Sequence, residues 1–271
     1  MVKISVLLAL WGLVIAPAVP QMVRTWLEHS DNSHAILVPF IAFYFGWTKR
    51  RELVSVELSS SGWGGACLAL CLILYLISYV GGIALGVRLM IVGSFIALVW
   101  NCFGWPILRV LAFPLFFLFF MVPVPDTFLN LVSFPLQMQA TKISTWIISL
   151  FSIPVYREGN MLYFVQTQLE VAEACSGIRS IISLGMLSVL LAYMSQGSWL
   201  HKAVLIVCAI PVAMLANILR VSGTGILAHF FGDQVARGFL HDFSGTTVFI
   251  FGLVVMIFFY KLLDLIHQKV R

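Results

Sequence analysis

The sequence predicts an all-helical, polytopic membrane protein that forms a single domain over residues 1–271. Hydrophobic residues make up 61% of the chain and charged residues only 10%, and the mean hydropathy is +1.02. This balance leaves too little polar surface to cover a soluble globular protein. Apolar stretches close to the length that crosses a bilayer also recur along the whole chain. We therefore expect about eight transmembrane helices.

The first stretch resembles a signal peptide, because Lys3 precedes an apolar run. Pro17, Pro20 and the following Gln-Met-Val-Arg make a poor cleavage site, so we predict a retained span. The second span is short, and the fourth ends close to Trp105. The eight predicted spans are Lys3–Val23, Ala35–Trp47, Trp63–Val80, Leu89–Phe103, Ile107–Val122, Gly177–Met194, Ala203–Val221 and Thr246–Leu263.

The basic residues predict the orientation of the chain in the membrane. The net charge is +5, but the basic residues lie scattered or at the ends of apolar segments rather than on one face, which argues against nucleic acid as a partner. With a cytoplasmic N-terminus, lysine and arginine are in excess on the inner side, and acidic residues slightly outnumber basic ones outside. The cluster Lys49–Arg51, directly after a span, is the strongest signal. Both termini are therefore predicted to be cytoplasmic.

The region between the fifth and sixth spans does not read as a simple span. Phe128–Phe151 is predicted to be an amphipathic helix at the membrane interface. It is followed by VYREGNMLYFVQTQLEVAEA, in which Glu158-Gly159-Asn160 separates two stretches rich in Val, Tyr and Phe. This pattern predicts a β-hairpin, which must lie in the outer compartment because an unpaired strand is not stable in lipid. Leu169–Ala172 alternates only weakly, so an irregular loop is the alternative.

A second polar segment between apolar stretches is EACSGIRS, Glu173 to Ser180, which has a carboxylate, a thiol, two hydroxyls and an arginine within eight residues. Ser176-Gly177 forms a plausible turn into the sixth span, which puts Cys175 at a helix N-terminus on the outer face. The N-terminal end of a helix dipole favours the thiolate, which is the nucleophilic form. Arg179 is four residues further along and acts in the same direction. The alternative role of Cys175 is helix packing, and Ser176 and Ser180 lack a nearby base.

The remaining cysteines lie in apolar surroundings, where a thiol behaves as a small inert hydrophobic group. Cys67 and Cys71 have helical i, i+4 spacing, but no histidine or carboxylate lies near them in sequence, which argues against a metal site. Cys102 and Cys208 are likewise within spans, so we do not predict a disulfide framework.

Two further outer-face residues could support a thiolate nucleophile. Arg220 comes at the end of the seventh span, where a cation is costly unless it is paired or functional, and it could hold a developing oxyanion. His241 precedes the eighth span and could transfer protons. Alternatively, Arg220 snorkels to the interface, and His241 forms a capping or interfacial pair with Asp242.

Six sequence blocks resemble the bacterial exosortases, of the exosortase/archaeosortase family of membrane cysteine transpeptidases. The family's cysteine, arginine and histidine fall on Cys175, Arg220 and His241. Asn32 and Ala35 depart from the tyrosine and glycine that relatives often have, which bears on the substrate class. The blocks are DNSHAILVPF from Asp31, FPLFFLFFMVPVP from Phe113, IPVYREGN from Ile153, LEVAEACSGIRSIISL from Leu169, NILRVSGTGILAHFFG from Asn217 and GFLHDFSG from Gly238.

The resemblance implies a protease/transpeptidase of the bacterial inner membrane, with its active site on the periplasmic or outer face. Its partners would be exported proteins whose C-terminal sorting signal has a Pro-Glu-Pro type motif, a transmembrane helix and a basic tail, in systems linked to exopolysaccharide production. The implied reaction uses Cys175 as nucleophile through a thioester, His241 as acid and base, and Arg220 on the oxyanion. It requires no metal or organic cofactor. Arg179, Glu173 and Arg157 are the candidate substrate-binding residues.

Two other functions fit a polytopic membrane protein. A transporter would place polar residues near the midplane in helices broken by Gly or Pro, and Pro211 and Gly223-Thr224-Gly225 keep that alternative open. A non-catalytic assembly factor for polysaccharide export would need the same bundle without the thiolate.

Overall fold

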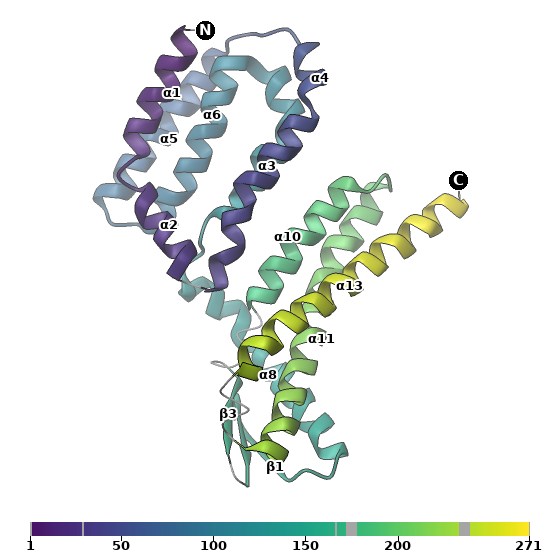
Figure 1. Cartoon of the computed structure of the whole chain (residues 1–271). Coiled ribbons are helices and arrows are strands. Elements are labelled where there is room, and N and C mark those ends of the chain that lie inside the picture. Colours follow the sequence, from purple (N-terminus) through teal and green to yellow (C-terminus); the bar gives the residue numbers. More distant parts are fainter. Residues whose placement is uncertain (1, 29, 166, 172–177, 233–238, 271) are drawn as a thin grey trace. The chain divides into compact units, whose positions relative to one another are not determined.

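The protein is mainly helical and folds into two compact units (Figure 1). The computed structural model describes residues 2–28, 30–165, 167–171, 178–232 and 239–270. The N-terminal unit is Met1–Pro125 and the C-terminal unit is Asp126–Arg271. Each is described separately below, and the single domain over 1–271 stays a prediction.

Helices α5 and α6 form a closely packed, apolar, antiparallel pair in the N-terminal unit. Gly64 of α5 lies against Asn101 of α6, and Gly86 of α6 lies against Ser78 of α5. A side chain at Gly64 would meet the Asn101 backbone, so glycine permits the close approach. The elements of this unit are α1 (Val2–Ile15), α2 (Val19–Glu28), the 3-10 helix η1 (Ser30–Ile36), α3 (Leu37–Thr48), α4 (Arg50–Val54), α5 (Gly62–Val80), α6 (Ala84–Val110), α7 (Ala112–Phe117) and the 3-10 helix η2 (Leu118–Met121).

Two of the predicted spans in this unit contain breaks. The first is two helices, α1 and α2, which are bent by 62° around Pro17, since proline lacks the N–H that a continuous helix needs. The predicted boundary near Trp105 coincides with a kink in α6, where Gly104 has φ 84° and ψ 176°. Pro106 follows the kink. The predicted fifth span is therefore the end of α6 followed by the short α7 and η2.

Hydrogen bonds connect α2, α6 and the segment that follows η2. Arg88 of α6 donates from Nη1 to the Pro123 carbonyl and from Nη2 to Thr25 Oγ1, each at 3.2 Å. Trp26 Nε1 donates to the Met121 carbonyl at 2.9 Å. These bonds hold α2 and the segment after η2 beside α6.

The C-terminal unit contains the predicted hairpin as part of a small sheet. Strands β1 (Val155–Glu158), β2 (Met161–Phe164) and β3 (Gln168–Glu170) pair antiparallel in that order. The turn between β1 and β2 contains Gly159, whose φ of 61° favours glycine. The hairpin is thus confirmed over the irregular loop, and β3 is an addition that the sequence did not predict. The helices of this unit are α8 (Asp126–Leu150), α10 (Ile178–Met194), α11 (Trp199–Phe231) and α13 (Phe239–Val270).

The sheet packs on α8 and α11 through a shared hydrophobic core. Gly225 of α11 faces this core so closely that an added Cβ would lie 2.8 Å from Ile148 and 3.0 Å from Phe164. The sheet is therefore fixed beside the C-terminal half of α11. The buried members of the core are Ile148, Ile153, Leu162, Phe164, Leu169, Val171 and Val221.

Helix α8 carries its polar side chains inward and its large apolar side chains outward. Ser133, Gln137, Thr141 and Ser144 recur at intervals of three and four and are buried, as one face of a helix requires. Ser144 Oγ donates to the Ile218 carbonyl of α11 at 3.2 Å. The large exposed apolar side chains are those of Phe128, Leu131, Phe134, Ile143, Trp146 and Leu150. This arrangement suits a helix in contact with lipid and agrees with the predicted amphipathic helix.

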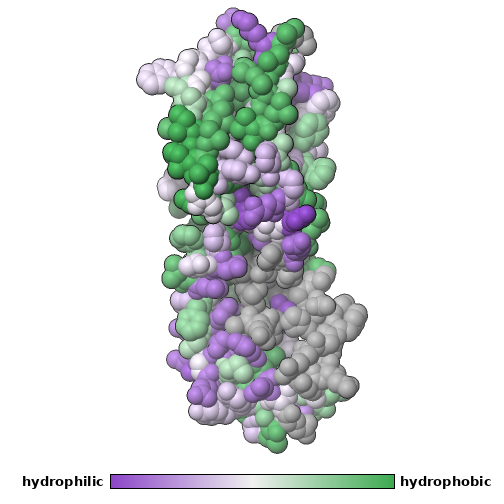
Figure 2. Space-filling model, turned by 90° about the vertical axis from the view of Figure 1, so that its left-hand side faces the viewer, coloured by the Kyte–Doolittle hydropathy of each residue, from purple (hydrophilic) through white to green (hydrophobic). Residues whose placement is uncertain are grey.

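The apolar helices indicate a multi-pass membrane protein. Within the described residues, α5, α6 and α11 are long and apolar enough to cross a bilayer, and the bent pair α1–α2 would make a fourth span. Shorter apolar helices occur at Ala112–Met121 and Ser180–Met194. Figure 2 shows large hydrophobic areas on the surface that it displays. The predicted total of eight spans is not confirmed.

Candidate functional site

Arg220 lies on a face of α11 that is apolar at one end and polar at the other. Ala213, Asn217, Arg220 and Thr224 are spaced by three or four residues and therefore share this face. Ala213, Asn217 and Thr224 are buried, and Arg220 is half-buried. Asn217, Arg220 and Thr224 thus put three polar side chains next to one another on a mostly hydrophobic helix.

The apolar end of this face packs against α10 and α13, which run alongside α11 (Figure 1). Leu184 of α10, Ala213 of α11 and Met256 of α13 belong to one buried cluster, with Ala209 and Val212. Gly252 of α13 is at the same level, because an added Cβ would lie 2.7 Å from Leu184 Cδ1. This layer gives a common reference height for the three helices.

The polar end of the face lies at the level of the first turn of α10. Short connections make α10 and α13 antiparallel to α11. At a rise of about 1.5 Å per residue, Arg220 is roughly 10 Å beyond Ala213, and Ile178 is roughly 9 Å beyond Leu184, in the same direction. By the same measure His241, in the first turn of α13, is roughly 16 Å beyond Gly252. Arg220 and the first turns of α10 and α13 therefore lie on the same side of the layer formed by Leu184, Ala213 and Met256.

The structure describes the predicted catalytic and substrate-binding residues to different extents. Arg220 is on α11 as stated. His241 and Arg179 lie in the first turns of α13 and α10, and their side chains are outside the described residues. Cys175 and Glu173 are in the segment 172–177, which is also outside them. The grouping of Cys175, Arg220 and His241 stays a prediction.

The two described ends of the segment that holds Cys175 both pack close to α11. Val171 is fully buried in the core that contains Val221, the neighbour of Arg220. Its backbone N–H donates to the Asn160 carbonyl at 3.0 Å. On the other side of the segment, α10 begins at Ile178 and packs on α11.

Arg157 has a local role in the hairpin. It lies on β1, and its Nη1 donates to the Gly159 carbonyl at 2.9 Å. The guanidinium therefore stabilises the turn between β1 and β2. The other N–H groups of this guanidinium lie in its plane and can donate further hydrogen bonds.

Three polar residues near Arg220 are not among the predicted site residues. Asn217 and Thr224 flank it on the same face, and Ser222 is buried on the other side of the helix. Ser222 Oγ makes no hydrogen bond to any described residue. The sequence pattern that could have revealed Asn217 and Thr224 is their i, i+3, i+7 spacing with Arg220 within an apolar helix, which places all three on one face.

The four cysteines inside apolar helices are free thiols and are half-buried. Cys67 and Cys71 lie on α5, Cys102 on α6 and Cys208 on α11. No described acid or histidine joins them in a group of three or more that could hold a metal ion. They are suitable reference positions for thiol chemistry at Cys175.

Comparison with known proteins identifies the family. A family model described as transmembrane exosortase matches residues 26–259. The match begins in α2, ends in α13 and includes Cys175, Arg220 and His241. No curated protein and no solved structure gave a match. Since the matched region is most of the chain and extends over both compact units, the chain belongs to the transmembrane exosortase family.

Proposed function

We propose that this protein is a membrane cysteine transpeptidase that cleaves the C-terminal sorting signal of exported proteins. Membership of the exosortase family, whose members are generally cysteine transpeptidases acting in protein sorting, carries this proposal. The bundle of apolar helices fits an enzyme whose substrates reach it through the lipid bilayer. The link to exopolysaccharide-associated sorting belongs to the same proposal.

In the proposed reaction the Cys175 thiolate attacks the backbone carbonyl beside the substrate's transmembrane helix. The C–N bond breaks, His241 gives a proton to the departing amine, and a thioester remains on Cys175. His241 then takes a proton from the acceptor, an amine or water, which attacks the thioester and displaces the Cys175 thiolate. Arg220 donates hydrogen bonds to the oxyanion that forms in both steps. Atoms and charges balance without a metal or an organic cofactor.

Three features of the C-terminal unit support these roles. Arg220 is half-buried in a polar stripe, where its charge is less screened than at an open surface. The helix that follows Cys175 starts at the level of Arg220. Val171, the last described residue before Cys175, is buried beside Val221. Together they favour a site at the junction of α10, α11 and α13.

The proposed substrate signal is a Pro-Glu-Pro type motif followed by a transmembrane helix and a basic tail. The substrate's own helix confines it to the bilayer, so the enzyme needs to recognise only a few residues at the interface. A basic residue must pair with the glutamate. We propose Arg179, one helical turn from Cys175, with Arg157 as the second candidate and Glu173 as a partner of Arg179 or of the motif.

We also propose that the site faces the outer side of the bacterial inner membrane and that both termini are cytoplasmic. The basic cluster Lys49–Arg51 at the end of α3 supports this orientation.

Cleavage of a membrane-anchored reporter carrying the sorting signal tests the proposal. Cys175→Ala should abolish cleavage while the protein still inserts and folds, because a small residue at a helix start costs little stability. Cys208→Ala is the matched control and should retain activity. A Cys175→Ala variant with full activity would exclude the enzyme and favour a transporter or a non-catalytic assembly factor. Mass spectrometry of the released product separates transfer to an amine from hydrolysis.

A further inference from the structure

A basic surface of the N-terminal unit contains two arginine–tryptophan pairs on neighbouring elements. Arg50, at the start of α4, has its Cζ 5.3 Å from the centre of the Trp47 ring. Arg109, in the last turn of α6, has its Cζ 5.3 Å from the centre of the Trp105 ring. Arg51 is next to the first pair. We call these five residues the arginine–tryptophan cluster.

Hydrophobic packing holds the two halves of the cluster together. Leu53 and Val56, in and just after α4, pack against a core that includes Ile107 of α6. An added Cβ on Gly46, which precedes Trp47, would lie 3.8 Å from Leu111 Cδ2, two residues after Arg109. The cluster is therefore formed by the fold rather than by flexible chain ends.

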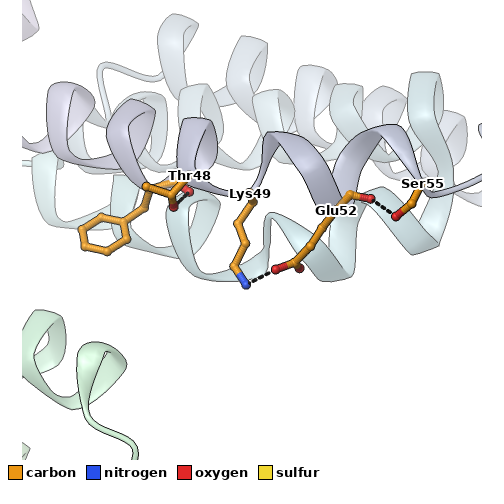
Figure 3. A network of polar contacts seen from close by, with 5 residues as sticks. Thr48, Lys49, Glu52 and Ser55 are labelled. Atoms are coloured by element: carbon orange, nitrogen blue, oxygen red, sulfur yellow. Dashed lines mark hydrogen bonds and ion pairs between the residues drawn. The ribbon is translucent and has the colours of Figure 1, made fainter.

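The carboxylates nearby leave the three arginines without an ionic partner. Lys49 Nζ and Glu52 Oε1 form an ion pair at 2.7 Å (Figure 3). Ser55 Oγ donates to the Glu52 backbone carbonyl at 2.8 Å. Within the part of the chain that the structure describes, Arg50, Arg51 and Arg109 make no ion pair, and Glu57, also exposed, forms none either. Lys49 thus pairs with the carboxylate of its own turn, and no described carboxylate forms an ion pair with the three guanidinium groups.

Stacking on tryptophan leaves the edges of the guanidinium groups available. A cation over an indole ring uses the face of the guanidinium, whereas its N–H donors point outward in the plane. Arg50 uses one donor, from Nη1 to the Trp47 carbonyl at 3.2 Å. A planar fork of free N–H donors fits a tetrahedral oxyanion such as phosphate, with two hydrogen bonds to each guanidinium.

The exposed side chains around the cluster place it at the depth of lipid headgroups. Trp47 is 58% exposed and Trp105 is 48% exposed, and tryptophan is enriched where the bilayer meets water. Val54, at the end of α4, and Leu58, four residues later, are 89% and 68% exposed, which suits contact with acyl chains rather than with water. This apolar rim argues for a lipid and against a soluble polyanion.

We propose that Arg50, Arg51 and Arg109 form a binding site for the phosphate of an anionic phospholipid headgroup, with Trp47 and Trp105 holding the guanidinium groups. The inference does not depend on the proposed peptidase activity. In the proposed orientation the site faces the cytoplasmic leaflet.

Titration of the full-length protein in neutral detergent micelles tests this site. The probes are phosphatidylglycerol, phosphatidylcholine and inorganic phosphate, and the measured quantity is the apparent dissociation constant at fixed ionic strength. Each cation near an anionic lipid surface contributes about fivefold in affinity, so the triple variant R50Q/R51Q/R109Q should bind phosphatidylglycerol at least roughly tenfold more weakly. Phosphatidylcholine should bind wild type and variant equally weakly.

A charge-matched control separates a built site from general attraction. The variant K3Q/K202Q/K261Q also loses three positive charges and should change the affinity less than about twofold. Equal weakening in both variants would overturn the site. So would equal affinities of the two lipids for wild type, or displacement of phosphatidylglycerol by an equal concentration of inorganic phosphate.

A second variant keeps the test valid if the triple variant does not fold. Arg50→Lys combined with Arg109→Lys keeps both charges but loses the planar fork, and should weaken phosphatidylglycerol binding on the order of threefold. Unchanged affinity in this variant would overturn the proposed role of the guanidinium groups.

Discussion

Two buried serine hydroxyls in the C-terminal unit differ in their hydrogen bonding. Ser144 Oγ donates to the Ile218 carbonyl, whereas Ser222 Oγ has no partner among the described residues. Ser144→Ala should lower the free energy of unfolding by about 1 kcal/mol, because a buried hydrogen bond is lost. Ser222→Ala should leave it unchanged or raise it by up to about 1 kcal/mol, because an unpaired polar group is removed. Reversible unfolding in mixed micelles measures both, and a larger loss for Ser222→Ala would refute the assignment.

Arg220 is the described residue that the proposed mechanism depends on most directly. Arg220→Lys retains the charge but loses the fixed fork of N–H donors. We expect cleavage of the reporter to fall by roughly 10²–10³-fold, with unaltered melting temperature. Arg24→Lys, at an exposed position on α2, serves as a reference for the loss of a guanidinium elsewhere, and cleavage should fall by less than about twofold. Full activity of Arg220→Lys would show that a positive charge alone is enough.

The sequence identified Arg220 but not its neighbours, for a physical reason. A cation in an apolar span is costly and therefore conspicuous. Asn217 and Thr224 are neutral, and small polar residues are common in membrane helices, where they bond to the backbone or to other helices. Their place beside Arg220 on a largely buried face becomes visible only in the structure.

At the level of elements, the kink in α6 gives the sharpest test of backbone geometry. Gly104 has φ 84°, and an added Cβ would overlap the Ser59 carbonyl oxygen. Gly104→Ala should therefore lower the free energy of unfolding by about 3 kcal/mol or more, from backbone strain and from the clash. Gly12→Ala, where an added Cβ meets no atom within 4 Å, should change it by less than about 0.5 kcal/mol. Equal effects of the two substitutions would contradict the kink.

Elements with strong local signals were predicted well. The predicted span Gly177–Met194 and α10 (Ile178–Met194) end at the same residue, and Gly159 marks the hairpin turn as expected. Strand β3 was missed because it is only three residues long and its local alternation is weak, so its preference for a strand is not visible in the sequence. The bend between α1 and α2 follows from Pro17, but its angle depends on packing against α6.

At the level of the whole molecule, the distribution of charge predicts which side of the membrane each segment faces. In a variant whose only cysteine is Cys175, a membrane-impermeant maleimide should label intact cells. In a cysteine-free variant with Ser55→Cys, after α4, labelling should require permeabilisation, because the basic cluster Lys49–Arg51 keeps that segment inside. The labelled fraction on a gel measures both. The reverse pattern would show that the chain is inserted with the opposite orientation.

The inward polar face of α8 has a consequence for how the protein is made. Ser144 and its acceptor Ile218 are 74 residues apart in the chain. At a synthesis rate of about 5–20 residues per second, roughly 4–15 s pass before α11 can cover α8. During this delay the serines, glutamine and threonine of α8 need water, while its phenylalanines and tryptophan need lipid. The nascent helix is therefore expected to wait at the membrane surface, and α11 sets the time at which it is taken into the finished bundle.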